Sequence, residues 1–195
     1  MKFLTRLFIY TLLFIASSNF GASAAEPEPD QTKLTEAIKA NTQEEVDLQI
    51  DNLLSFAHKF KGVPYRLGAN GPHRFDCSGF TSYVYKEFGY KLARRASLQV
   101  NNGEKVERGN LKPGDLVFFG GRGNRRGIGH VGIITEVDTD GNGFSFIHAS
   151  TRNGITINHS TDSYYRVRYR GACRIIKPDQ SEMAIVDDST ASSDE

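Results

Sequence analysis

The chain has 195 residues, and its 24 Lys and Arg against 23 Asp and Glu give a formal net charge of +1 at pH 7. This length is enough for one domain with a sizeable core. No long apolar stretch follows the N-terminal region, which argues against a multi-pass membrane protein. The two cysteines raise the possibility of one disulfide bond, but a domain of this size does not need one.

Residues 1–25 have the pattern of a secretory signal peptide. Lys2 and Arg6 form a short basic region, and the apolar stretch 7–16 is too short to span a bilayer comfortably. Ala22-Ser23-Ala24 then provides an A-x-A cleavage signal. We therefore expect export to the periplasm, the cell envelope or the outside, with no stable membrane anchor after cleavage. An uncleaved anchor is the alternative.

Charge divides the rest of the chain into three parts. Residues 26–52 are acidic and begin with a leader segment. A helix is expected to start near their end, because apolar residues recur at helical spacing over 46–60. Residues 53–178 form the expected domain and are rich in Lys and Arg, whereas the Ser- and Asp-rich tail 179–195 is acidic and expected to be disordered. A basic domain attracts anionic polymers, which in an exported protein would be wall peptides with free carboxylates. Nucleic acid is the competing partner, but export and the lack of a recognition motif argue against it. A basic surface that is simply solvated and binds no polymer is the other alternative.

A cysteine stands at the start of the next predicted helix. Apolar side chains recur at helical spacing over 80–88, and Gly89 follows as a stop signal. Cys77 therefore lies in the first turn, with Asp76 as its N-cap. Backbone N–H groups and the helix dipole favour a negative sulfur there, and the thiolate is the nucleophilic form. The alternative is a buried structural cysteine.

The second half of the chain is typical of a meander of strands. Residues 90–110 are expected to be loop-rich, and the Gly- and Arg-rich segment 120–127 is expected to connect a hairpin. That segment lacks the Lys and Ser/Thr of a phosphate loop and opens no helix, which excludes nucleotide binding. Helices followed by strands indicate an α+β fold, with N-terminal helices on an antiparallel sheet of about five to six strands. The strands are expected at 116–119, 130–137, 144–150, 155–159 and 168–176.

Two of these strands, 130–137 and 144–150, carry the candidate catalytic histidines. If they are neighbours, His130 and His148 can project from one face towards the start of the Cys77 helix. A thiol needs a base within about 3–4 Å, and the base needs a third group to fix its tautomer. Cys77, His130 and His148 can fill these roles in that order. Neither histidine belongs to a close His or Cys pair, so no metal site is expected.

Five segments, in order and at ordinary spacing, resemble the NlpC-type cysteine peptidases, which are papain-like hydrolases of bacterial peptidoglycan peptides. The resemblance extends from about Leu53 to Ile176. The matching segments are GVPYRLG (62–68), DCSGF (76–80), LKPGDLVFF (111–119), GHVGI (129–133) and FIHAS (146–150).

This resemblance implies a role for each of six residues. Cys77 would be the nucleophile, His130 the base and His148 the residue that orients the base. The other three would stabilise the oxyanion or hold the substrate: Tyr65, which lies beside the site, and Asp76 and Ser78, on either side of Cys77.

The leading hypothesis is an exported, monomeric cysteine endopeptidase that cuts amide bonds in peptidoglycan stem peptides or cross-links. This mechanism requires no cofactor. An amidase or acyltransferase acting on another envelope substrate is one alternative, and a non-catalytic wall-binding module is another. Cys173 lies in an expected strand and is interpreted as a small buried residue, because a disulfide bond to Cys77 would block the nucleophile.

Overall fold

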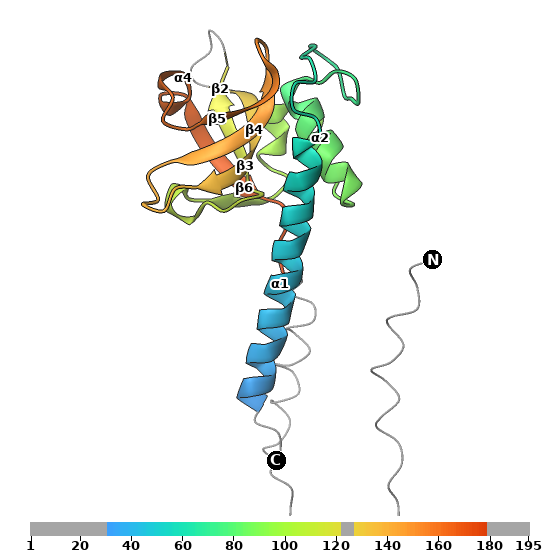
Figure 1. Ribbon diagram of the computed structural model, residues 1–195. Coiled ribbons are helices and arrows are strands. Elements are labelled where there is room, and N and C mark those ends of the chain that lie inside the picture. The colour runs from blue at the N-terminus through green and yellow to red at the C-terminus, as the bar shows by residue number, and fades with distance from the viewer. Residues whose placement is uncertain (1–30, 122–126, 179–195) are drawn as a thin grey trace, which may run out of the picture.

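Six antiparallel strands form a single sheet in the computed structural model, which describes residues 31–121 and 127–178 (Figure 1). The strand order is β1-β6-β2-β3-β4-β5, so the last strand lies between the first two. The bounds are Glu104–Val106 (β1), Leu116–Gly120 (β2), Ile128–Val137 (β3), Phe144–Ser150 (β4), Gly154–His159 (β5) and Tyr169–Arg174 (β6). The α+β fold class is confirmed. The expected signal peptide and acidic tail lie outside the described residues.

A long helix, α1 (Gln31–His58), leads into the sheet. Near its C-terminal end Leu53 and Ala57 are fully buried, whereas its N-terminal part extends away from the sheet (Figure 1). The apolar rhythm predicts only the part after Val46, because the preceding residues carry few large apolar groups and form a helix through local propensity. Within the described ranges, no helix is long and apolar enough to cross a membrane.

Helix α2 (Cys77–Glu87) begins and ends where the sequence predicts. Asp76 is its N-cap residue, and the carboxylate accepts a hydrogen bond of 2.7 Å from the N–H of Gly79. The helix ends before Gly89, whose φ of +88° lies in the left-handed region that glycine adopts at little cost. The buried face of α2 packs on β3 and β4, which fixes where its first turn meets the sheet.

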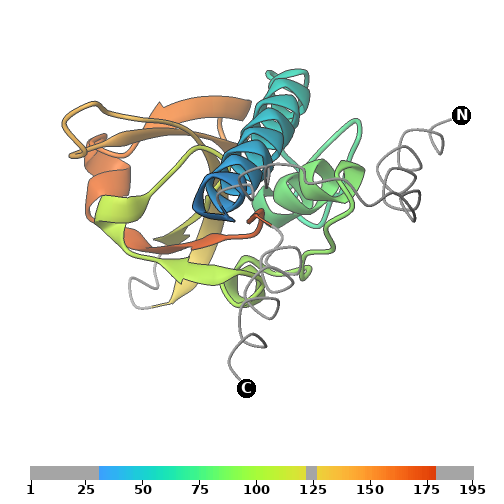
Figure 2. The same cartoon turned by 90° about the horizontal axis from the view of Figure 1, so that it is seen from below.

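Both faces of the sheet are covered, and for this reason β2 is buried at every position. Leu116 belongs to the core under α1 and α2, and its neighbour Val117 belongs to a second core on the other face. Tyr165 of the short helix α4 (Ser163–Arg166) closes this second core. Figure 2 shows α1 and α2 on one side of the sheet and α4 on the other.

The expectation of a loop over residues 90–110 is only partly right. This segment contains α3 (Ala96–Gln99), β1 and a single 3₁₀ turn, η1 (Arg108–Asn110). β1 is only three residues long and largely exposed, and it pairs with β6 from far along the chain. A strand defined by distant pairing has no local pattern that would reveal it.

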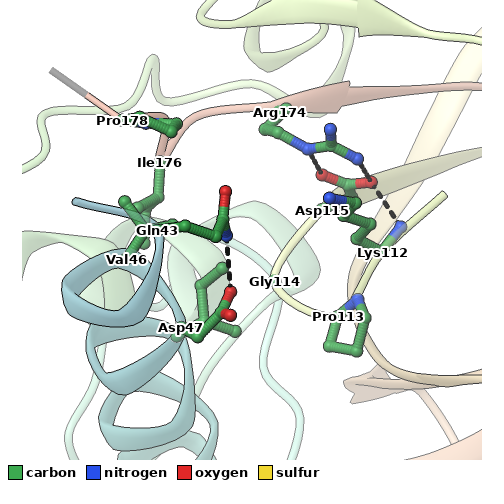
Figure 3. A pocket seen from close by; sticks show the side chains of 11 residues that line it. Gln43, Val46, Asp47, Lys112, Pro113, Gly114, Asp115, Arg174, Ile176 and Pro178 are labelled. Carbon is green, nitrogen blue, oxygen red and sulfur yellow. Dashed lines mark hydrogen bonds and ion pairs between the residues drawn. The ribbon is translucent and has the colours of Figure 1, made fainter. Parts of the chain in front are cut away.

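A buried ion pair joins the turn before β2 to β6. Asp115 is 1% exposed, and its two carboxylate oxygens accept hydrogen bonds of 2.8 Å from the guanidinium group of Arg174 (Figure 3). The backbone N–H of Lys112 donates a third, also of 2.8 Å. The crevice beside this pair lies between α1 and the turn, and none of the predicted site residues lines it.

Candidate active site

Cys77 is half-buried at the first position of α2, and its sulfur lies against β3. The backbone N–H of Val131, the residue after His130, is close enough to this sulfur to lower the pKa of the thiol. The fold therefore brings the start of α2 and the start of β3 together. Cys77 is a free thiol, and Cys173 is also free and fully buried on β6, so the disulfide alternative is wrong.

The surroundings of the Cys77 thiol act in both directions on its pKa. Burial raises the pKa most, and the nearby Asp76 carboxylate raises it further. Nearby backbone N–H groups, including that of Val131, lower it, but the balance is a raised pKa. The helix start was expected to favour the thiolate, but burial and Asp76 outweigh that effect, so Cys77 is a thiol in the free protein. A base must accept the thiol proton as the sulfur reacts.

His130 on β3 and His148 on β4 form a direct pair. Nε2 of His130 lies 2.9 Å from Nδ1 of His148, and the two rings are nearly perpendicular. His148 is fully buried. Among the described residues, Nδ1 of His130 has no hydrogen-bond partner, so it is the ring nitrogen left to accept a proton.

A glycine gives the two rings room to meet. Gly132 lies opposite His148 on the neighbouring strand, and a Cβ atom built at Gly132 would be 3.1 Å from Cβ of His148. It would also be 2.8 Å from the ring of Phe146. Without a side chain at Gly132, His148 can lean diagonally across the strands towards His130, which is a same-face neighbour in an antiparallel pair.

Both histidines are held in the neutral form. Burial lowers the pKa of His130 to about 3, and the neighbouring His148 contributes to the same shift. Burial also lowers the pKa of His148, against the opposing effect of its hydrogen bond to Asn158. A neutral imidazole has a free lone pair, so His130 is able to act as a base near neutral pH.

Asp76 is the centre of a polar cluster beside the thiol. Besides capping α2, it forms an ion pair with Arg94, with one N–O distance of 2.6 Å and another of 3.1 Å. The backbone N–H of Gly68 donates a further bond of 2.9 Å to it, and Arg94 also donates to the hydroxyl of Ser78 at 3.0 Å. From the sequence, Arg94 had no role beyond its place in the expected loop-rich segment 90–110, because its partner Asp76 is distant in the chain.

Tyr65 lies close to the thiol. Burial raises the pKa of its hydroxyl most, followed by the effects of the neighbouring Cys77 and Asp76. The hydroxyl of a protonated tyrosine is a hydrogen-bond donor, so Tyr65 can donate to an oxygen next to Cys77. No group of three or more His, Cys, Asp or Glu side chains that could hold a metal occurs within residues 31–121 and 127–178.

Comparisons with known proteins agree on one family. The NlpC/P60 family model matches residues 62–174. The murein DD-endopeptidase MepS/murein LD-carboxypeptidase of Escherichia coli K12 is 34% identical over 176 residues, which is 86% of this chain and 88% of that protein. A gamma-DL-glutamyl hydrolase of Bacillus subtilis is 39% identical over 120 residues, 60% of this chain but only 27% of that protein. A solved structure of an NlpC/P60 family protein from Bacillus cereus ATCC 10987 superposes with a TM-score of 0.59 and 29% identity, over 66% of this chain and 40% of that one.

The partly buried, neutral His130 predicts a loss of stability in acid. The pKa of His130 is about 3 in the folded protein and about 6.5 in an unfolded chain, so the unfolded chain binds more protons between these values. The free energy of unfolding should fall as the pH drops through this window. The melting temperature of His130→Asn should therefore fall less than that of the wild type between pH 7 and 4, as measured by calorimetry. The exposed His73→Asn should behave like the wild type. Equal falls for His130→Asn and the wild type would contradict the burial of a neutral His130.

Proposed function

Since the chain belongs to the NlpC/P60 family of cysteine peptidases, we propose that it is an exported endopeptidase that hydrolyses amide bonds in peptidoglycan stem peptides or their cross-links. The observation that carries this proposal is the approach of the Cys77 sulfur to Val131 on β3, the residue that follows the paired, neutral His130. The murein endopeptidase of Escherichia coli supports the substrate class, because it matches this chain over most of both lengths.

In the first half of the proposed reaction, the sulfur of Cys77 attacks the carbonyl carbon of the amide. The thiol proton passes to Nδ1 of His130 as the C–S bond forms. The backbone N–H of Cys77 and the hydroxyl of Tyr65 donate hydrogen bonds to the resulting oxyanion. His130 then returns the proton to the leaving nitrogen, the C–N bond breaks and a thioester remains on Cys77.

In the second half, water attacks the thioester carbonyl and His130 accepts a proton from it. The C–S bond breaks, the thiol of Cys77 is protonated again and the product leaves as a carboxylic acid. His148 holds the other nitrogen of His130 throughout, so that the lone pair at Nδ1 keeps its direction. No step requires a cofactor or a metal.

Tyr65, Ser78 and Asp76 complete the proposed substrate site. Asp76 is almost fully buried and its oxygens are occupied by protein donors, so we propose that it acts on substrate through Arg94. The side chain of Arg94 is 43% exposed and offers a cation at the rim of the site. The free carboxylates of wall peptides match this charge.

The proposal includes the expected organisation of the chain. Cleavage after Ala24, within the expected signal region 1–25, would leave Ala25 as the first residue after export. Residues 53–178 would be the catalytic domain, and 179–195 would remain an acidic tail. The protein would act as a monomer in the periplasm or the cell envelope. An N-terminal sequence of the mature protein that begins at Ala25 would support export and cleavage.

Cys77→Ala should abolish hydrolysis and leave the fold intact, because the half-buried side chain packs little. Wild-type protein should release muropeptides from purified sacculi, and the variant should release at least about 10⁴-fold less. Mass spectrometry of the products also identifies the bond that is cut. Cys173→Ala is the matched control and should keep most of the activity. Digestion by Cys77→Ala would disprove the nucleophile, and sacculi that co-sediment with wild-type protein without release would favour a binding module.

Substitutions of the two histidines should separate their roles. His148→Asn and His148→Gln keep an acceptor oxygen for His130 and should retain measurable activity. His148→Leu leaves the Nε2–H of His130 unpaired and should lose about 10²-fold or more in kcat. His130→Asn should be nearly inactive, because an amide is no base. If His148→Asn is inactive while His130→Asn works, the two roles must be exchanged.

A further inference from the structure

Two more side chains, Asn158 and Asp162, extend the line of hydrogen bonds that runs from His130 to His148. Nε2 of His148 lies 3.0 Å from Oδ1 of Asn158 on β5. Nδ2 of Asn158 lies 2.9 Å from Oδ2 of Asp162, which stands just before α4. Asn158 is half-buried and Asp162 is exposed, so the line runs from the site to the surface.

Asp162 occupies the N-cap position of α4 without capping that helix. Its side chain makes no cap hydrogen bond. The carboxylate points back to β5 instead, where Oδ2 accepts from Nδ2 of Asn158 and, at 3.3 Å, from the backbone N–H of His159. Capping α4 therefore does not explain this orientation of the side chain.

The chemistry of these groups fixes which atom donates and which accepts at each hydrogen bond of the line. A carboxylate only accepts hydrogen bonds, so Asp162 requires the NH₂ group of Asn158 to face it. The amide oxygen of Asn158 then faces His148, and because that oxygen also only accepts, the proton of His148 must be on Nε2.

The same logic extends through both rings. In a neutral imidazole one nitrogen carries the proton and the other accepts, so Nδ1 of His148 becomes an acceptor. Nε2 of His130, 2.9 Å away, must then donate. The proton of His130 is thereby held on Nε2, and the lone pair is left on Nδ1, the nitrogen that takes the thiol proton in the proposed reaction.

Tyr165 cannot perform this selection. Its hydroxyl is 3.3 Å from the same Nε2 of His148, but a hydroxyl can donate or accept and so tolerates either tautomer. The amide oxygen of Asn158 tolerates only one.

We propose that Asn158 and Asp162 are positioning residues that set the tautomers of His148 and His130, so that Nδ1 of His130 is kept ready to accept a proton. This inference rests on the proposed function for its catalytic consequence, but the tautomers themselves exist without substrate. The two residues act through His148 and do not touch the reacting atoms.

Ring-nitrogen NMR on ¹⁵N-labelled protein at pH 7 tests the tautomers directly. Wild-type protein should show the proton on Nε2 of both histidines. Asn158→Leu removes the acceptor and should give mixed tautomers. On soluble muropeptides kcat should fall about 10–100-fold with little change in KM, the range found when the hydrogen-bond partner of a metal-binding histidine is removed. The rate at which iodoacetamide labels Cys77 should fall with it. His159→Asn, a change on the neighbouring residue of β5 whose side chain pairs with Asp138, is the matched control and should leave all three readouts unchanged.

A paired exchange provides the rescue. Asp162→Asn alone lets the amide of Asn158 face either way and should give a partial loss. In the double variant with Asn158→Asp, the new carboxylate at position 158 accepts from Nε2 of His148, and the new amide at position 162 donates to that carboxylate. The tautomers and kcat should therefore recover together. A merely structural role would not give this recovery.

The outcomes separate this inference from the proposed function. Wild-type tautomers in Asn158→Leu, a proton on Nδ1 of His148 in the wild type, or a shift caused by Tyr165→Phe but not by Asn158→Leu would each overturn the inference. Tautomers as predicted in a wild-type protein that releases no muropeptides would support the inference and contradict the proposed function alone.

Discussion

The close approach of the start of α2 to β3, where the backbone N–H of Val131 lies near the sulfur of Cys77, joins the two halves of the candidate site. One half is a helix start and the other is a strand that carries His130. Neither half could act alone, because a thiol far from a base is a poor nucleophile near neutral pH. The rest of the fold holds these two backbone segments in contact.

Close backbone approaches make this meeting possible. A Cβ atom at Gly79, in the first turn of α2, would lie 2.2 Å from the carbonyl oxygen of Ala69, so only glycine lets the preceding loop close over the helix start. Gly132 does the same for the rings of His130 and His148. The loop in turn provides Gly68, whose N–H binds the capping carboxylate of Asp76. The site thus requires glycine at positions 79 and 132, where a side chain would block the close approach.

The three proposed catalytic side chains are uncharged in the free protein. Burial disfavours charge on Cys77, His130 and His148, and the buried charge of Asp76 beside Cys77 is neutralised by Arg94. Charge therefore develops only during reaction, when a proton leaves the sulfur for His130. A directed line of hydrogen bonds then decides which nitrogen receives that proton, and a low-dielectric environment makes each contact in the line stronger.

Local patterns were enough to predict much of this structure. The N-cap, apolar spacing and stop glycine defined α2, and apolar runs or alternation between turn residues defined five of the six strands. β1 escaped prediction because three exposed residues carry no pattern of their own. The direction of the Cys77 pKa also escaped, since the helix start is visible in the sequence but burial is not. Asn158 and Asp162 gave no signal, because their meaning depends on a contact between β4, β5 and the turn before α4.

Trapping the covalent intermediate tests the central claim most directly. Wild-type protein mixed with soluble muropeptides, quenched in acid within one turnover and digested, should yield a peptide containing Cys77 that carries the mass of the acyl half of the substrate. The adduct should disappear with hydroxylamine, as a thioester does. Product release without any adduct at Cys77, or an adduct on another residue, would contradict the account.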